Sequence, residues 1–195
     1  MTAPGLRRRH DRELLDALEA HPAEAFQGEI WRVTAQGRDA LHASSAGGRW
    51  IPQREFEVLC TSLAWVGALA EIGDRLALEP VWPSRIAHTL HRITARTDRT
   101  LRFADLDGLA PLGVGVRRYA GFDYAATQAV AAAAYILEFD GLIVPSARGP
   151  ALNLVIFTEK PGPGAVLEMA ASEPVDGSAW PSGRHRSPPR APTPS

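Results

Sequence analysis

The chain has 195 residues, of which 45% are apolar and 22% are charged, so its length suits one domain with short additions. Twenty-one basic and 22 acidic residues give a net charge of −1, which supplies no general positive field and argues against direct binding of nucleic acid. The longest apolar run, Ala129–Leu137, is far shorter than the ~20 residues that cross a membrane, and a single cysteine, Cys60, excludes an internal disulfide or a thiolate metal site.

Composition divides the chain into parts. The last 24 residues contain six prolines and only four apolar residues, a bias that predicts disorder. We therefore expect an N-terminal helical extension at 1–25, a globular domain at 26–170 and a disordered Pro-rich tail at 171–195. The basic run Arg7–His10 leads into a polar amphipathic segment and not into the apolar stretch of a signal peptide, so a cytoplasmic location is expected.

The first predicted elements are a helix and two strands. Apolar residues recur at helical spacing over Arg12–Ala20, and Pro22 ends this helix. Glu29–Thr34 is predicted as a strand and is followed by a loop rich in Gly, Ser and Ala, from 35 to 48. A second strand is predicted at Glu57–Thr61.

The middle of the chain is less clear. Ser62 is predicted to cap a helix over Leu63–Ile72, which Gly73 ends. Arg85–Arg96 mixes β-branched and polar residues, so the pattern leaves helix and strand both open.

Stronger patterns return further along. Asp123–Glu138 is predicted as a helix because an aspartate precedes an alanine-rich body and Phe139-Asp140-Gly141 closes it. Leu142–Val144 and Leu152–Phe157 are short, apolar and β-branched, as buried strands are. Helices and strands are mixed without the steady alternation of a doubly wound sheet, which predicts an α+β fold.

Most familiar functional motifs are absent from the sequence. Gly113-Val114-Gly115 lacks the third glycine of a dinucleotide-binding fingerprint, and the chain has neither a phosphate-binding P-loop nor a Gly-x-Ser-x-Gly elbow. His88 and His91 could share one face of a helix, but no third ligand lies near them in the sequence. We therefore predict no metal site.

A set of polar residues stands in apolar or glycine-rich surroundings: Arg32, Arg49, Glu71, Ser146 and Arg148. Each one alone could be structural, since a buried arginine can simply pair with a carboxylate. Taken together, two arginines suit a ligand with two phosphates, because the guanidinium fork binds oxyanions bidentately. A single carboxylate beside them suits hydrogen bonding to a ribose hydroxyl or stabilisation of a developing cation.

Seven short motifs occur in an order that resembles a known family. They are Trp31-Arg32, Gly47-Gly48-Arg49-Trp50, Val58-Leu59-Cys60-Thr61-Ser62-Leu63, Ala68-Leu69-Ala70-Glu71, Asp123-Tyr124 with Thr127-Gln128, Phe139-Asp140-Gly141-Leu142-Ile143-Val144-Pro145-Ser146-Ala147-Arg148, and Asn153-Leu154-Val155-Ile156-Phe157. No single motif is decisive. Together, over about Gly28–Phe157, they resemble the RES domain, which is named for its arginine, glutamate and serine.

The resemblance implies a compact mixed α+β domain related to the ADP-ribosyltransferase fold. RES proteins are toxins of bacterial toxin–antitoxin pairs that consume NAD⁺ by breaking its nicotinamide–ribose bond, with water or inorganic phosphate as acceptor. The resemblance therefore implies an NAD⁺ glycohydrolase or NAD⁺ phosphorylase, with NAD⁺ as substrate and no cofactor. Its implied partner is an antitoxin with a helix-turn-helix domain of the Xre type, which covers the active site, and a homodimer within that complex is a further possibility.

The same resemblance implies which residues form the site. The family's arginine, glutamate and serine correspond to Arg32, Glu71 and Ser146, which become the catalytic candidates. The residues expected to bind substrate are Arg49, Trp50, Cys60, Arg148 and Asn153.

The proposed chemistry needs only one carboxylate. Ordinary glycosidases use two, one of which protonates a poor leaving group, whereas nicotinamide leaves NAD⁺ as a neutral molecule and needs no acid. Glu71 would bind the ribose and stabilise its oxocarbenium-like transition state, and Arg32 and Arg49 would grip the pyrophosphate or an incoming phosphate. Ser146 would bind the nicotinamide end or position the acceptor.

Two departures from the family keep other interpretations open. The family usually has tyrosine where this chain has Cys60, and asparagine where it has Ile51. The apolar neighbours of Cys60 predict a buried, inert thiol. The alternatives are a protein ADP-ribosyltransferase and a catalytically decayed RES domain that acts as an antitoxin-binding interaction protein.

Overall fold

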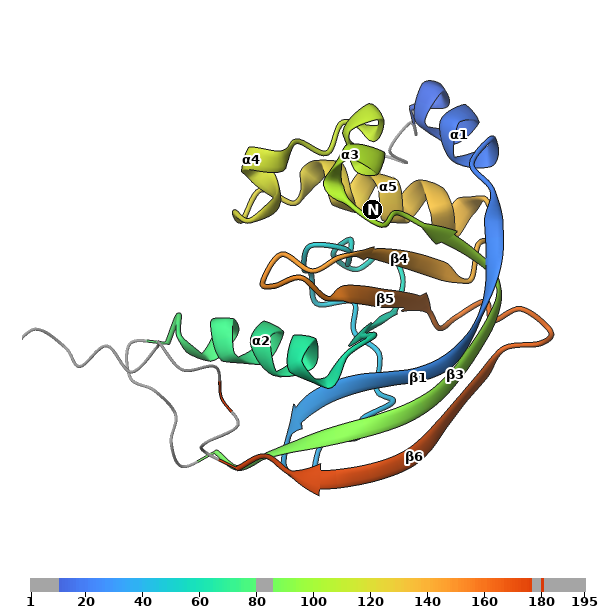
Figure 1. Ribbon diagram of the computed structural model, residues 1–195. Helices are drawn as coiled ribbons and strands as arrows, with labels where there is room; N and C mark the ends of the chain where they lie inside the picture. The colour runs from blue at the N-terminus through green and yellow to red at the C-terminus, as the bar shows by residue number, and fades with distance from the viewer. Residues whose placement is uncertain (1–10, 80–85, 177–179, 181–195) are drawn as a thin grey trace, which may run out of the picture.

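The computed structural model describes residues 11–79, 86–176 and 180, and these form a mixed α+β domain (Figure 1). The sequence-based prediction of an α+β fold is therefore confirmed. In chain order the elements are α1 (Arg12–Glu19), β1 (Ala23–Ala35), β2 (Val58–Ser62), α2 (Trp65–Leu76), β3 (His88–Arg102), α3 (Leu106–Leu109), η1 (Ala110–Leu112), α4 (Val116–Tyr119), α5 (Ala125–Ile136), β4 (Gly141–Pro145), β5 (Leu152–Phe157) and β6 (Val166–Pro174).

The strands form one sheet in the order β1-β2-β5-β4-β3-β6, and β1 also pairs with β3. The pairings β1–β2–β5–β4–β3–β1 therefore make a closed circuit, with β6 added along the outer side of β3. Only β3 and β4 pair in parallel, through Thr100–Arg102 and Gly141–Ile143. Figure 1 shows β1, β3 and β6 as long curved strands that bend around the shorter β4 and β5.

The long strand β3 settles the element that the sequence left open. Ile93 and Ala95 point inward and are fully buried, while Arg92, Thr94 and Arg96, which alternate with them, are exposed. This two-residue alternation is that of a strand with one face on a core. Along its two edges, β3 pairs with β1 and with β6. Its backbone is therefore hydrogen-bonded, while its polar side chains project from the face that is exposed to solvent.

The main core lies between the sheet and the helices α1 and α5. Within α5, the residues Val130–Ala134 are all buried, and their small side chains let the helix lie close to β4. Leu18 of α1 is fully buried in the same cluster. Thus α1 is an integral part of the core, although the sequence analysis placed it in an N-terminal extension.

Several predicted boundaries differ from the structure. Ser62 does not cap α2: the helix begins at Trp65 after Ala64, whose side chain makes no capping hydrogen bond, and Gly73 is a buried residue inside the helix. The helix continues three residues past Gly73 to Leu76, so the glycine does not end it. The helices α1 and α5 and the strands β4 and β5 confirm their predictions within a few residues.

The strand β6 has no counterpart among the predicted elements. It pairs with β3 from Arg96↔Val166 to Thr89↔Pro174 and therefore extends four residues into the range assigned to the tail. Residues 177–179 and 181–195, and with them most of the predicted disorder, lie outside the described residues. The domain boundaries at 25 and 170 stay a prediction.

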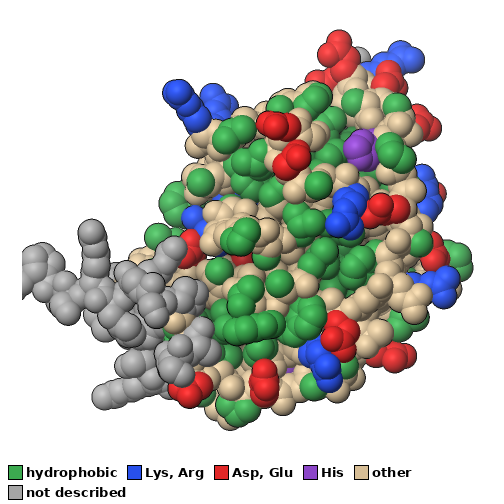
Figure 2. All heavy atoms as spheres, in the orientation of Figure 1, with side chains coloured by type: hydrophobic (Ala, Val, Ile, Leu, Met, Phe, Trp, Pro, Cys, Tyr) green, Lys and Arg blue, Asp and Glu red, His purple; other side chains and the backbone are tan. Residues whose placement is uncertain are grey.

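The surface agrees with the charge balance of the sequence. On the face drawn in Figure 2, acidic and basic side chains are interspersed and no broad region carries a single sign. Within the described residues, no helix is both long and apolar enough to span a membrane.

Replacement of Leu18 tests whether α1 belongs to the folding unit. Leu18→Ala leaves a cavity in the core and should lower the free energy of unfolding by about 2–5 kcal/mol, as measured by urea denaturation. The control is Leu78→Ala, because Leu78 is 62% exposed and its loss should change stability by less than about 0.5 kcal/mol. Equal effects of the two substitutions would mean that α1 is only an appended segment.

Candidate active site

Glu71 is the centre of a hydrogen-bonded polar cluster. The hydroxyl of Ser146 donates to Glu71 Oε1 over 2.6 Å, and the side-chain amide of Asn153 donates to the same oxygen over 2.9 Å. Because both bonds go to Oε1, the other carboxylate oxygen, Oε2, is left for a further donor. The fold thus joins three predicted site residues that are 75 and 82 positions apart in sequence.

A close helix–strand approach makes these contacts possible. A Cβ atom on Gly67 would stand 2.3 Å from Ser62 Oγ and 2.6 Å from the Cβ of Ala151, distances at which a side chain cannot fit. The glycine therefore allows α2 to lie against the ends of β2 and β5. One turn later, this places Glu71 beside the segment that follows β4.

Arg148 adds a second link between the same helix and the same turn. Its Nε lies 3.2 Å from Asp74 Oδ2 in a largely buried ion pair, and its backbone N–H donates to Ser146 Oγ over 3.0 Å. Asp74 follows Glu71 by three residues, so both carboxylates lie on one face of α2. Asp74 was missed by the sequence analysis, although its spacing from Glu71 on a predicted helix was a usable signal.

Arg49 connects the loop after β1 to the region around α4. Its guanidinium donates to the backbone carbonyls of Tyr119 and Gly121 and lies 4.8 Å and 5.0 Å from the ring centroids of Tyr119 and Tyr124. Burial lowers the pKa of Arg49, while the two tyrosines and Glu71 act in the opposite direction. Arg49 thus interacts electrostatically with Glu71.

The start of α5 holds the backbone around Arg49. The Gln128 side chain donates to the carbonyls of Gly48 and Ile51 over 2.8 Å and 3.2 Å, and Thr127 Oγ1 donates to the Arg49 carbonyl over 2.5 Å. These contacts give a physical reason for the Thr-Gln pair in the sequence.

Trp50 is placed in the core and not on an open surface. Only 4% of it is exposed, and it packs edge-on against Tyr119 at a centroid distance of 6.3 Å. This position favours support of Arg49 over direct contact with a substrate.

Arg32, on β1, is anchored to the loop that follows this strand. Its NH1 donates to the carbonyls of Ala40 and His42 over 2.7 Å and 2.8 Å, which fixes the loop that follows β1. Burial lowers the pKa of Arg32, whereas Cys60 and Asp39 raise it. The NH2 and Nε groups are left for an anion, so structural and binding roles are compatible in this residue.

The histidines that suggested a weak metal motif have other contacts. His91 Nε2 lies 2.9 Å from Thr34 Oγ1 and its Nδ1 lies 2.8 Å from Ser172 Oγ, so both ring nitrogens have hydroxyl partners. His88 packs edge-on against Trp180. Across the part of the chain that the structure describes, no group of three His, Cys, Asp or Glu residues is arranged to hold a metal ion.

Cys60 differs from its prediction. The expectation of a buried thiol is wrong, because the side chain is exposed to solvent. Surrounding protein nevertheless raises the pKa of this thiol to about 12, chiefly by desolvation, and Arg32 and Glu71 both interact with it. The raised pKa keeps this thiol protonated at neutral pH.

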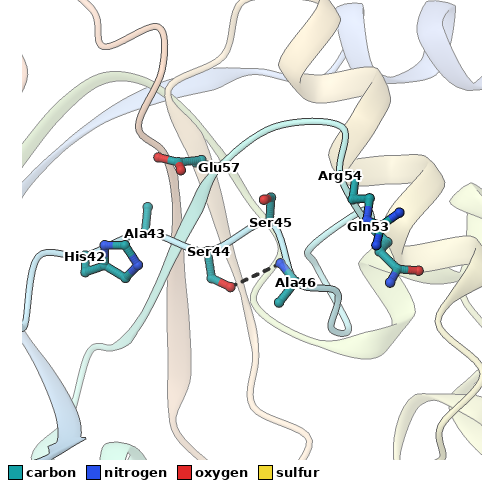
Figure 3. A pocket seen from close by; sticks show the side chains of 8 residues that line it. All are labelled: His42, Ala43, Ser44, Ser45, Ala46, Gln53, Arg54 and Glu57. Atoms are coloured by element: carbon teal, nitrogen blue, oxygen red, sulfur yellow. Dashed lines mark hydrogen bonds between the residues drawn. The ribbon is translucent and has the colours of Figure 1, made fainter. Parts of the chain in front are cut away.

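A separate hollow of about 460 Å³ lies between residues 42–46 and 53–57 (Figure 3). Its lining is mixed and includes His42, Arg54 and Glu57, but none of the eight predicted site residues. Hydrogen bonding and charge, and not this hollow, therefore define the candidate site around Glu71.

These features define a class: a mixed α+β domain in which one hydrogen-bonded glutamate is flanked by partly buried arginines. Residues 29–186 match the family model of the RES domain, and the chain belongs to the RES domain family. The resemblance inferred from the seven motifs is confirmed.

Individual relatives agree with this assignment. The chain is 24% identical over 160 residues to NAD(+) phosphorylase MbcT of Mycobacterium tuberculosis and to the same protein of Mycobacterium bovis, covering 79% of this chain and 86% of each relative. Among solved structures, the M. tuberculosis MbcT–MbcA toxin–antitoxin complex matches with a TM-score of 0.73 and 23% identity, over 85% of this chain and 93% of the matched chain. This structural match confirms the fold.

The state of Cys60 can be tested by alkylation. At pH 8 a thiol with a pKa near 12 is almost entirely protonated, so iodoacetamide should modify folded Cys60 at least about 100-fold more slowly than free cysteine. The rate is measured by mass spectrometry, with the denatured chain as control. Modification at the rate of free cysteine would show that the thiol is not desolvated.

Proposed function

We propose that this protein degrades NAD⁺ at the Glu71 cluster by cleaving the nicotinamide–ribose bond, with inorganic phosphate or water as acceptor. The observation that carries this proposal is the Glu71 carboxylate, which receives both of its hydrogen bonds on Oε1 and keeps Oε2 for a ligand, and which interacts electrostatically with the partly buried Arg49. Membership of the RES family and the relative named NAD(+) phosphorylase support the same reaction.

The charge of Glu71 is suited to stabilising a cation. Its two side-chain partners, Ser146 and Asn153, are neutral hydrogen-bond donors, while the guanidinium of Arg148 pairs with Asp74. The negative charge of Glu71 is therefore not compensated by a direct ion pair with Arg148. Such a fixed, preorganised charge stabilises positive charge that develops on the ribose in the transition state.

Bond cleavage then follows without an acid. Nicotinamide takes the electron pair of the glycosidic bond and leaves as a neutral molecule. A phosphate oxygen attacks the ribose carbon that it leaves, which yields ADP-ribose 1″-phosphate, and attack by water yields ADP-ribose and a proton. Oε2 of Glu71 would accept a hydrogen bond from a ribose hydroxyl during this step.

The arginines and the serine receive distinct roles. Arg32 and Arg49 each use part of the guanidinium to hold loop carbonyls, and the remaining N–H groups would bind the pyrophosphate of NAD⁺ or the incoming phosphate. Ser146 would act mainly by orienting the carboxylate of Glu71, because its hydroxyl proton is already directed to Oε1.

We also propose that an antitoxin regulates this activity. The support is the matched structure, which is a toxin–antitoxin complex. The partner expected from the sequence is a small helix-turn-helix protein of the Xre type. A homodimer of this chain within the complex and a cytoplasmic location complete the proposal.

The reaction is tested with purified protein and NAD⁺. Wild type should release nicotinamide, and Glu71→Gln should lower kcat by about 10²–10³-fold because it removes the charge but keeps the shape. Glu79→Gln is the matched control, since Glu79 is exposed beyond the end of α2 and its loss should leave kcat within about twofold of wild type. Equal activity of Glu71→Gln and wild type would exclude the proposed site.

The acceptor is identified by its products. Assays with and without phosphate, followed by mass spectrometry, separate ADP-ribose 1″-phosphate from ADP-ribose. Labelled ADP-ribose attached to protein without free product would indicate the transferase alternative. An absence of NAD⁺ consumption by the wild type would favour the decayed domain.

Co-expression tests the proposed partner. Induction of this chain should lower cellular NAD⁺ and stop growth, and simultaneous expression of its cognate helix-turn-helix protein should restore both. NAD⁺ is measured in extracts by an enzymatic cycling assay. Restored growth with persistently low NAD⁺ would contradict neutralisation at the active site.

A further inference from the structure

The peptide group between Pro145 and Ser146 is held from both sides. The hydroxyl of Tyr119 donates to the Pro145 carbonyl over 2.5 Å, and the Ser146 N–H donates to the Ala151 carbonyl over 2.8 Å. Because a peptide group is planar, two hydrogen bonds on its opposite sides fix its orientation. They thereby fix the direction in which the Ser146 side chain leaves the backbone.

That direction determines where the serine proton goes. Ser146 Oγ accepts a hydrogen bond from the Arg148 N–H over 3.0 Å and donates its own proton to Glu71 Oε1 over 2.6 Å. A hydroxyl has one proton to donate. Ser146 is only 8% exposed, so solvent offers few alternative acceptors. A small rotation of the preceding peptide group would therefore move the proton away from Glu71.

Tyr119 is itself well placed to act as a fixed donor. It is 3% exposed at the end of α4, and its ring lies against Trp50 and under Arg49. Burial raises the pKa of Tyr119 to about 12, with Trp50 and Arg49 acting in the opposite direction. The hydroxyl thus keeps its proton throughout the physiological pH range.

We propose that Tyr119 is a positioning residue that orients the Glu71 carboxylate through the Pro145–Ser146 peptide group. Tyr119 also holds Arg49 through its ring and its backbone carbonyl. One residue thus contacts both Arg49 and the peptide group that precedes Ser146. The effect on catalysis rests on the proposed NAD⁺ reaction, whereas the effect on Ser146 does not.

Tyr119→Phe removes the hydroxyl and keeps the ring. It should lower kcat by about 10-fold or more and leave the KM for NAD⁺ within about twofold, because it displaces the charge and not the substrate. Tyr135→Phe is the matched control: it also removes a donating hydroxyl from a partly buried tyrosine, but its acceptor over 2.9 Å is Glu159, which is not one of the site residues. Equal kinetics of the two variants would overturn the proposal.

A double-substitution cycle separates positioning from general destabilisation. If Tyr119 acts through Ser146, then Tyr119→Phe should have little further effect on kcat in a Ser146→Ala background. Multiplied effects in the double variant would mean that Tyr119 acts independently of the serine. If a variant melts below the assay temperature, all four proteins are compared at a lower temperature at which each is folded.

A measurement that needs no activity decides the structural step. Hydrogen exchange of the Ser146 amide should accelerate at least about 10-fold in Tyr119→Phe and remain unchanged in Tyr135→Phe, because only the first releases the Pro145–Ser146 peptide group. Unchanged exchange would overturn the proposal. Accelerated exchange in a protein whose wild type leaves NAD⁺ intact would support the positioning contact and reject the proposed reaction.

Discussion

The candidate site depends on how the carboxylate of Glu71 is oriented without a direct ion pair to an arginine. Glu71 is held by neutral donors, while the arginine that could neutralise it is paired with Asp74 one turn along the same helix. A direct bond to arginine would orient Glu71 equally well but would reduce its attraction for a developing cation. The two carboxylates of α2 therefore have different roles. Asp74 binds Arg148 and fixes the turn after β4, and Glu71 remains available for a ligand.

The second constraint is that the two arginines proposed to bind the ligand also hold the fold. Arg32 and Arg49 both bind loop carbonyls, and both have their pKa lowered by burial. Partial burial strengthens any contact with an anion because fewer waters compete for the guanidinium. The long connection between β1 and β2 is thus tied down by the residues that the proposed function needs for the substrate.

Much of the fold was predictable where a pattern is local. The helix that became α5 and the strands β4 and β5 have strong patterns of composition, and their predictions hold. The strand β6 was missed because its residues are nearly all exposed, so pairing with β3 and not an apolar face defines it. Ser62 and Gly73 carried the usual signals of helix ends. In the structure Ser62 instead packs against Gly67 of α2, and Gly73 is buried inside the helix, which a sequence does not display.

The sequence suggested candidate site residues, but not the contacts that join them. Resemblance to a family identified Arg32, Glu71 and Ser146 as candidates, and Glu71, Ser146 and Asn153 meet as expected of one site. The contact of Tyr119 with Pro145 was not predictable, because it joins α4 to β4 across 26 residues. Cys60 was misjudged for a similar reason, since buried neighbours in a strand do not reveal whether the side chain between them faces solvent.

The wide sequence separation of the cluster has a consequence for the timing of protein synthesis. Glu71 receives its hydrogen bonds from residues 75 and 82 positions later, on segments that flank the turn between β4 and β5. A growing chain that ends before this hairpin holds the glutamate but neither of its donors. The complete site therefore forms only when the domain is nearly finished, so a truncated product of translation would lack the assembled cluster.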